Sequence, residues 1–268
     1  MQNSAVKLFD SFSPRYLVPN GVTCFSMVLG FASIRTSLTA TEPRAFVEAA
    51  WLILYTVLLD KADGFLARRL KATSSIGVQL DSFSDFVTFG LAPAALLVRA
   101  LPTLAPNALG RGPLSYVLLG VATAYALGAA LRLAKFNVTT ADDDPRFFRG
   151  LPSTSSGGLL ASAFLAHRDL GLGEAAAVGL LGWMTLNTLL MLSNLPQPKI
   201  GPAKALWAKV LTAGVLLCGF VLIPLRKYPV FLCLLSSTVT LIGFVYGLVV
   251  QRKESGDDDP AATHALSS

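Results

Sequence analysis

Four aspartates in one short stretch of the chain carry the clearest chemical signal in the sequence. Asp60 and Asp63 are three positions apart, and Asp81 and Asp85 are four apart. On a helix, either spacing places both carboxylates on one face. Such a cluster in apolar surroundings repels itself unless it is protonated, paired or bound to a cation. Carboxylate oxygens suit Mg²⁺ or Mn²⁺, and two such ions can clamp both oxygens of an in-line phosphoryl displacement.

The residues beside the first aspartate pair suit a phosphorylated ligand. Gly64 has no side chain, so a nucleotide could approach the backbone there. Arg68 adds a planar guanidinium that can bind phosphate through two hydrogen bonds. A single aspartate such as Asp60 could equally be a solvated helix end, but four at these spacings favour a metal site.

Apolar segments long enough to cross a bilayer must position these aspartates. The chain has 268 residues, of which 53% are hydrophobic and 14% charged, and its mean hydropathy is +0.59. A helix of roughly 20 apolar residues spans the hydrocarbon core. The pattern predicts eight spans, at 17–38, 45–67, 82–101, 114–136, 152–166, 175–193, 205–224 and 229–250. The short connection between the second and third spans would bring the four carboxylates together.

The spans predict an all-α membrane bundle with one domain, residues 1–250, and a disordered cytoplasmic tail, residues 251–268. The fifth span is short and rich in Gly and Ser, so a count of seven stays open if it is re-entrant. With eight spans, Lys and Arg on one side outnumber those on the other by about two to one, which predicts cytoplasmic termini and a cytoplasmic site. The net charge of +6 then reflects topology and anionic lipids, not nucleic acid.

The aspartate segment resembles the signature of the CDP-alcohol phosphotransferase family, DxxDGxxAR followed after eight residues by GxxxDxxxD. Residues 60–85 match every fixed position. The resemblance implies a bundle with six core spans, two divalent metal ions (Mg²⁺ or Mn²⁺) and a homodimer. It also implies metal ligation by Asp60, Asp63, Asp81 and Asp85, a CDP-lipid site that includes Asp60, Gly64, Ala67, Arg68 and Gly77, and base catalysis by Asp85.

Three further runs resemble the bacterial and archaeal phosphatidylserine synthases of this family. Residues 81–93 match DSxxDxxxFGxAP, residues 132–137 resemble RLARFN, and residues 148–152 match FxGLP. The resemblance implies transfer of a phosphatidyl group from CDP-diacylglycerol to L-serine in a bacterial inner membrane. An amino-acid acceptor needs donors for its carboxylate. We expect them to be Arg132, Lys135, Asn137 and Arg149.

Two departures keep other acceptors open, namely glycerol phosphate, inositol phosphate and choline. Lys135 stands where the family run has arginine, and a lysine cannot form the bidentate fork. Residues 153–157, Ser-Thr-Ser-Ser-Gly, replace a more apolar stretch. Arg132 and Lys135 could also be snorkelling anchors at a helix end.

Two other interpretations concern the first span and the class of function. Asn20 and Thr23 lie in a run that resembles the family's PNxxT element, and they either contact the CDP-lipid or cap a helix. A cation transporter would also use buried carboxylates. It has no need, however, for Gly64 and Arg68 beside them.

Overall fold

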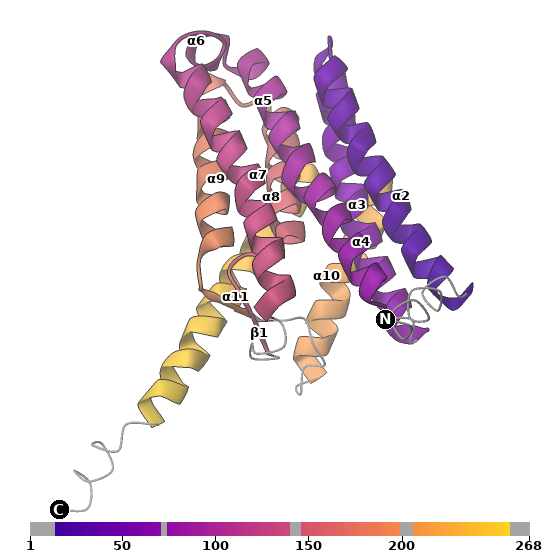
Figure 1. Cartoon of the computed structure of the whole chain (residues 1–268). Coiled ribbons are helices and arrows are strands. Elements are labelled where there is room, and N and C mark those ends of the chain that lie inside the picture. Colours follow the sequence, from indigo (N-terminus) through magenta and orange to yellow (C-terminus); the bar gives the residue numbers. More distant parts are fainter. Residues whose placement is uncertain (1–13, 71–73, 140–145, 199–205, 258–268) are drawn as a thin grey trace, which may run out of the picture.

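The computed structural model of the chain is a bundle of long helices joined by short connections (Figure 1). It describes residues 14–70, 74–139, 146–198 and 206–257. The described helices are α2 (Pro14–Thr39), α3 (Pro43–Arg69), α4 (Ser75–Asp85), the π-helix η1 (Phe86–Leu91), α5 (Ala92–Leu104), α6 (Pro106–Leu109), α7 (Pro113–Thr139), α8 (Ser153–Asp169), α9 (Glu174–Leu192), α10 (Leu206–Leu225) and α11 (Pro229–Asp257).

Within the described residues, five helical stretches are long and apolar enough to cross a membrane, judged by length and composition. They are Tyr16–Thr39, Ile76–Leu104, Pro113–Val138, Glu174–Leu192 and Pro229–Arg252. The other three predicted spans are also helical, as α3, α8 and α10. However, α3 carries five charged residues near its end, namely Asp60, Lys61, Asp63, Arg68 and Arg69, α8 has only 17 residues, and in α10 the part whose side chains are described is limited to Gly214–Leu225. A polytopic helical membrane protein is therefore supported, while the count of eight is not confirmed.

The core lies where the helices face one another, yet the outside of the bundle is also apolar. Ile53 of α3, Leu96 of α5, Phe164 of α8 and Met184 of α9 are fully buried or nearly so. Large apolar side chains on the outer faces of α2, α7, α9 and α11 are exposed, among them Phe31, Leu127, Leu189 and Leu241. Helices that are apolar all round are typical of a bundle solvated by lipid.

The helix that carries Asp81 and Asp85 changes its geometry directly after them. Phe86–Leu91 form the π-helical turn η1 before the chain continues as α5. Neighbouring helices approach this turn closely through glycines. A Cβ on Gly30 of α2 would lie 2.5 Å from Cγ2 of Thr88, and a Cβ on Gly157 of α8 would lie 2.8 Å from Cδ1 of Phe89. Single π turns inside helices are frequent at functional sites.

A small sheet lies at the same end of the bundle as the start of α4 (Figure 1). Strand β1 (Phe147–Arg149) pairs antiparallel with β2 (Pro196–Pro198), with Arg149 opposite Pro196. Helix α11 packs against β2 because Gly247 lets it approach the Pro196 carbonyl, where a Cβ would collide, and Gly243 faces Gln197. The last helix therefore supports β2, the strand that pairs with the one carrying Arg149.

The helix α11 runs past the expected domain boundary at residue 250. It continues to Asp257, and Figure 1 shows its last turns projecting from the bundle. The first part of the segment expected to be disordered, 251–268, is thus helical, because Gln, Arg, Lys and Glu at positions 251–254 are good helix formers. Residues 258–268 lie outside the described part of the chain.

Candidate active site

Three of the four aspartates converge at one end of the bundle. Asp60 and Asp63 come from the last turns of α3 and Asp81 from α4, and one carboxylate oxygen of each lies within 4.8 Å of those of the others. Asp63 is buried, and the other two are half-buried. On the exposed side, Lys61 Nζ lies 3.1 Å from Asp60 Oδ2. Three hard oxygen donors at this separation, with one nearby cation, fit a divalent metal ion.

The carboxylate of Asp63 is oriented by the first described helix. Thr23 Oγ1 lies 2.8 Å from Asp63 Oδ2, to which it donates, and 3.1 Å from the Pro19 carbonyl oxygen. Ser84 Oγ in turn donates to the Thr23 carbonyl at 3.2 Å. Thr23 lies well inside α2, so it does not cap that helix. Its hydroxyl instead connects α2 to the carboxylate group.

The residues expected to bind the CDP-lipid come from α2, α3 and the start of α4. A Cβ on Gly77 would lie 3.1 Å from Asn20 Oδ1, so these two positions are neighbours. The Gly77 N–H donates to Ser74 Oγ at 3.0 Å, which caps α4. On α3, the guanidinium of Arg68 lies over Gly64, with Nη1 3.5 Å from where a Cβ would be. Ala67, on the same last turns of α3, is half-buried.

Asp85 has different partners from the other three aspartates. It lies one helical turn after Asp81 and does not belong to the group of three. Ser153 Oγ donates to Asp85 Oδ2 at 3.2 Å, and Arg132 Nη1 donates to Ser153 Oγ at 3.0 Å. Asp85 is therefore connected through one hydroxyl to a cation on α7.

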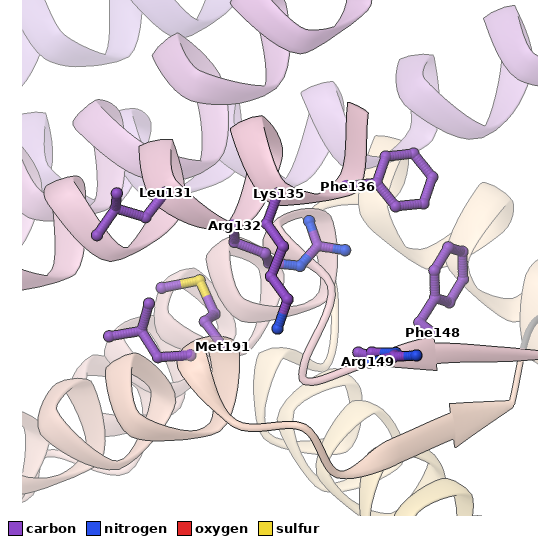
Figure 2. A pocket seen from close by; sticks show the side chains of 8 residues that line it. Leu131, Arg132, Lys135, Phe136, Phe148, Arg149 and Met191 are labelled. Atoms are coloured by element: carbon purple, nitrogen blue, oxygen red, sulfur yellow. The ribbon is translucent and has the colours of Figure 1, made fainter. Parts of the chain in front are cut away.

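A cavity of about 80 Å³ lies beside this chain of hydrogen bonds (Figure 2). Arg132 and Lys135 of α7 and Arg149 of β1 line it, and the rings of Phe136 and Phe148 lie 5.8 Å apart at its side. Lys135 Nζ donates to Asn194 Oδ1 at 2.7 Å. Arg132 Nε is buried and has no hydrogen-bond partner among the described residues. Three cations and one open donor fit a small anionic group.

Asn137, the fourth residue expected at the acceptor, lies elsewhere. Its Nδ2 donates to Ser82 Oγ at 2.9 Å, which joins α7 to α4, and it is not among the residues that line the cavity. Helical geometry explains the difference. Lys135 follows Arg132 by three positions and shares its face, whereas Asn137 follows by five and points elsewhere. Asn137 thus sits next to the aspartate helix.

Two polar residues at this site, Ser153 and Asn194, were not among the site residues predicted from the sequence. Ser153 directly follows the FxGLP run, and its position there was an available signal. Asn194 lies after α9 and reaches Lys135 across the fold, so no local pattern marks it. Ser153 and Asn194 do not line the cavity themselves, but they hydrogen-bond Arg132 and Lys135, which do.

Comparison with known proteins gives one consistent result. Residues 16–191 match the family described as CDP-alcohol phosphatidyltransferase. Proteins named CDP-diacylglycerol–serine O-phosphatidyltransferase are similar to the chain. The protein from Helicobacter pylori J99 is 32% identical over 72% of this chain and 76% of its own length. The one from Mycobacterium bovis is 27% identical over 93% and 86%, and that from Methanocaldococcus jannaschii is 30% identical over 73% and 84%.

Proposed function

The chain belongs to the CDP-alcohol phosphatidyltransferase family, and from that premise we propose that it transfers a phosphatidyl group from CDP-diacylglycerol to L-serine. The products are phosphatidylserine and CMP. The observation that carries the acceptor is the small cationic cavity lined by Arg132, which Ser153 connects to Asp85. The names of the similar proteins from three distant organisms support the same choice.

The metal-binding proposal rests on the donor set of Asp60, Asp63 and Asp81. Their carboxylates offer only hard oxygen ligands, and Asp63 is buried with its charge supported by a hydroxyl donor. These three would hold divalent ions, and Asp85 would complete the set. When bound, two Mg²⁺ or Mn²⁺ ions would polarise the phosphoryl oxygens and stabilise the charge that develops on the leaving CMP.

The donor site we propose follows the three adjacent helices α2, α3 and α4. Asn20 and Gly77 would bind the cytidine part of the nucleotide, with Gly77 and Ala67 leaving room for it. Arg68, which already lies over Gly64, would bind the pyrophosphate with its planar fork. The acyl chains would remain in the lipid around the exposed outer faces of these helices.

The acceptor site we propose is the cavity between α7 and β1. Arg132, Lys135 and Arg149 would bind the carboxylate of serine, and the open Nε–H of Arg132 would find its partner there. A carboxylate is small enough for about 80 Å³, whereas a lipid chain is not. Asn137 would not contact the acceptor; it would orient Ser82, the neighbour of Asp81, through its hydrogen bond.

Asp85 is the proposed general base. It lies between the aspartate group and the cavity, connected to the latter by Ser153 and Arg132. Its carboxylate would take the proton of the serine hydroxyl as the oxygen attacks the lipid-proximal phosphorus in line. The bond to the CMP oxygen would then break on the opposite side.

An acceptor screen tests the proposed function directly. Protein purified in detergent is mixed with CDP-diacylglycerol, Mn²⁺ or Mg²⁺, and serine, glycerol 3-phosphate, inositol phosphate or choline. We expect CMP release that requires both a divalent ion and serine. A higher rate with another alcohol would overturn the acceptor but keep the family activity. No CMP release with any alcohol would overturn the reaction itself.

The contact between Thr23 and Asp63 gives a second prediction. Thr23→Val keeps the shape of the side chain and removes the donor to Asp63 Oδ2. Groups that orient a metal ligand typically change metal affinity by about 10- to 100-fold. We therefore expect Thr23→Val to bind Mn²⁺ about 10- to 100-fold more weakly in an electron paramagnetic resonance titration, whereas Thr23→Ser binds as the parent does. Equal affinity in all three proteins would show that the hydroxyl does not support the site.

The membrane setting completes the proposal. We infer that the protein lies in a bacterial inner membrane with the site on the cytoplasmic side, because Lys and Arg are enriched on that side of the predicted topology. The homodimer remains a prediction from the family resemblance.

A further inference from the structure

The hydroxyl of Ser153 lies between the carboxylate of Asp85 and the guanidinium of Arg132. Its oxygen donates to Asp85 Oδ2 at 3.2 Å and accepts from Arg132 Nη1 at 3.0 Å. The side chain is fully buried, with 0% of its surface exposed. A hydroxyl has one proton, and an arginine can only donate. The proton of Ser153 is therefore directed to Asp85, and its lone pair to Arg132.

Helix α8 is held in register with the aspartate helix. Ser153 and Gly157 are one turn apart on α8, and Asp85 and Phe89 are four positions apart on the facing element. Where Ser153 reaches Asp85, Gly157 packs on Phe89, whose Cα would lie 3.1 Å from a Cβ at that glycine. The missing side chain at Gly157 thus allows the close approach that brings Ser153 within hydrogen-bond distance.

Helix α7 makes two contacts at the same levels. Tyr125 Oη donates to the Phe89 carbonyl oxygen at 2.7 Å, inside the π-helical turn. Arg132 lies seven positions later on α7, on about the same face, and reaches Ser153. The Tyr125 contact fixes the backbone of η1, and the Arg132 contact joins α7 to Ser153 and, through it, to Asp85.

The start of α8 is itself held firmly. Gly150 has φ +77°, and a Cβ there would lie 2.6 Å from the Ser193 carbonyl oxygen. The Gly150 N–H donates to the Leu195 carbonyl at 2.8 Å, and the Leu151 N–H to the Leu190 carbonyl at 2.9 Å. The turn before Ser153 is thus anchored to the end of α9.

We propose that Ser153 is a positioning residue: its hydroxyl prevents direct contact between Arg132 and Asp85 and connects the two by hydrogen bonds. The proposal rests on the proposed function. Arginine and carboxylate in direct contact tend to form a bidentate pair that uses both oxygens. With the serine between them, the side-chain hydrogen bond of Asp85 within the described part of the chain goes to Oδ2, which leaves Oδ1 for the acceptor hydroxyl. Arg132 also lines the cavity, and its buried Nε–H has no partner among the described residues.

The test compares two buried serines of the first turn of α8. Ser153→Ala removes the spacer, so Arg132 can turn to Asp85. Ser156 has the same burial, and its hydroxyl donates to Asn187 Oδ1 at 3.1 Å and lies next to Tyr125, so it is not part of the chain from Arg132 to Asp85. Ser156→Ala is therefore the matched control for lost packing and lost hydrogen bonding. Ser153→Thr keeps the hydroxyl and serves as the conservative variant.

We expect Ser153→Ala to lower kcat for CMP release by about 10- to 100-fold, the effect of one hydrogen bond to a charged group. The KM for serine should rise, because Arg132 leaves the cavity, while the KM for CDP-diacylglycerol stays unchanged and Asp60, Asp63 and Asp81 still bind Mn²⁺ in a paramagnetic resonance titration. Ser153→Thr should recover most of kcat, and Ser156→Ala should leave both KM values and kcat near those of the parent.

Two results would overturn the proposal. In the first, Ser153→Ala has the kinetics of the parent protein. In the second, Ser153→Ala and Ser156→Ala lose activity equally and in step with their thermal stability, which would make Ser153 a packing residue. Failure of the proposed function can be told apart from failure of this proposal, because it would already be seen in the acceptor screen with the parent protein. If the parent uses another alcohol in the acceptor screen, the same variants are compared with that alcohol.

Discussion

Asp85→Asn is expected to lower kcat for CMP release by about 10²- to 10⁴-fold, the usual contribution of a general base. Asparagine has nearly the shape of aspartate and can still accept from Ser153 at its carbonyl oxygen. It cannot take a proton from the acceptor hydroxyl. The loss should therefore appear in kcat with serine at saturation, measured as CMP release over time.

Two measurements identify the cause of that loss. Mn²⁺ titration of Asp85→Asn should still show binding, because Asp60, Asp63 and Asp81 form a group without it. Asp169→Asn, at the exposed far end of α8, is the matched control for removing one carboxylate and should keep full activity. Near-normal turnover of Asp85→Asn with Mn²⁺ bound would show that the base is another group.

Asp63→Asn should have a second large effect, on metal binding as well as on turnover. Asp63 is the buried member of the group of three, and its carboxylate is within 4.8 Å of the other two. Bound divalent ions supply several kcal/mol of stabilisation to phosphoryl transfer, and each 1.36 kcal/mol is a tenfold change in rate. We expect kcat/KM to fall by about 1,000-fold or more. In an electron paramagnetic resonance titration, the signal of unbound Mn²⁺ should persist at protein concentrations at which the parent protein binds all of the ion.

The same variant is informative about folding. Asp63→Asn removes the buried negative charge from a group of three neighbouring carboxylates, so the free energy of unfolding without metal should stay the same or rise. Thermal unfolding in detergent with a chelator measures this. A protein that is destabilised without metal but still binds Mn²⁺ as the parent does would show that Asp63 has a structural role and is not a ligand.

The arrangement of ionisable groups separates this enzyme from a cation transporter. A transporter would need ionisable or polar groups along a path across the bundle. Among the described side chains, the buried ionisable ones are Asp63, Tyr125 and His167, and His167 lies at the end of α8 away from Ser153. The other buried side chains are neutral, either apolar like Leu96 or hydroxyls and amides like Thr56 and Asn187, so no row of charged groups crosses the described core. The carboxylates therefore form a local site at one end.

Local spacing explains why so much of the aspartate site was predictable. Asp60 and Asp63 share a helix face because of the helical period, and so do Asp81 and Asp85. The described structure has only a short connection between α3 and α4, which restricts where the two helix ends can lie. The convergence of Asp60, Asp63 and Asp81 follows from these two local properties.

The acceptor site was predictable only in part. Arg132 and Lys135 are three positions apart on one helix, so their common orientation is a local property. Arg149 joins them because β1 pairs with β2, nearly fifty positions later in the chain. Asn137 was grouped with them by sequence proximity, but the turn of the helix directs it to Ser82.

The number of membrane spans shows a different limit. Hydropathy identifies segments that are apolar enough to leave water, but lipid and a protein interior are similar solvents for such segments. Five helices meet the requirement by themselves. Helices α3 and α8 do not, because α3 carries charged residues and α8 is short and rich in small residues. Whether these two helices cross the membrane therefore depends on the helices packed around them.

The sequence by itself determined the class of protein, the family signature and the pairing of aspartates on two helix faces, because periodicity and spacing act over a few residues. Only the tertiary structure decided that Asp85 faces Ser153, that Thr23 supports Asp63 and that Arg149 reaches the cavity of Arg132. Each of these contacts joins segments that are distant in the chain. Their geometry depends on how closely whole helices approach, which glycines such as Gly157 permit and no local pattern reveals.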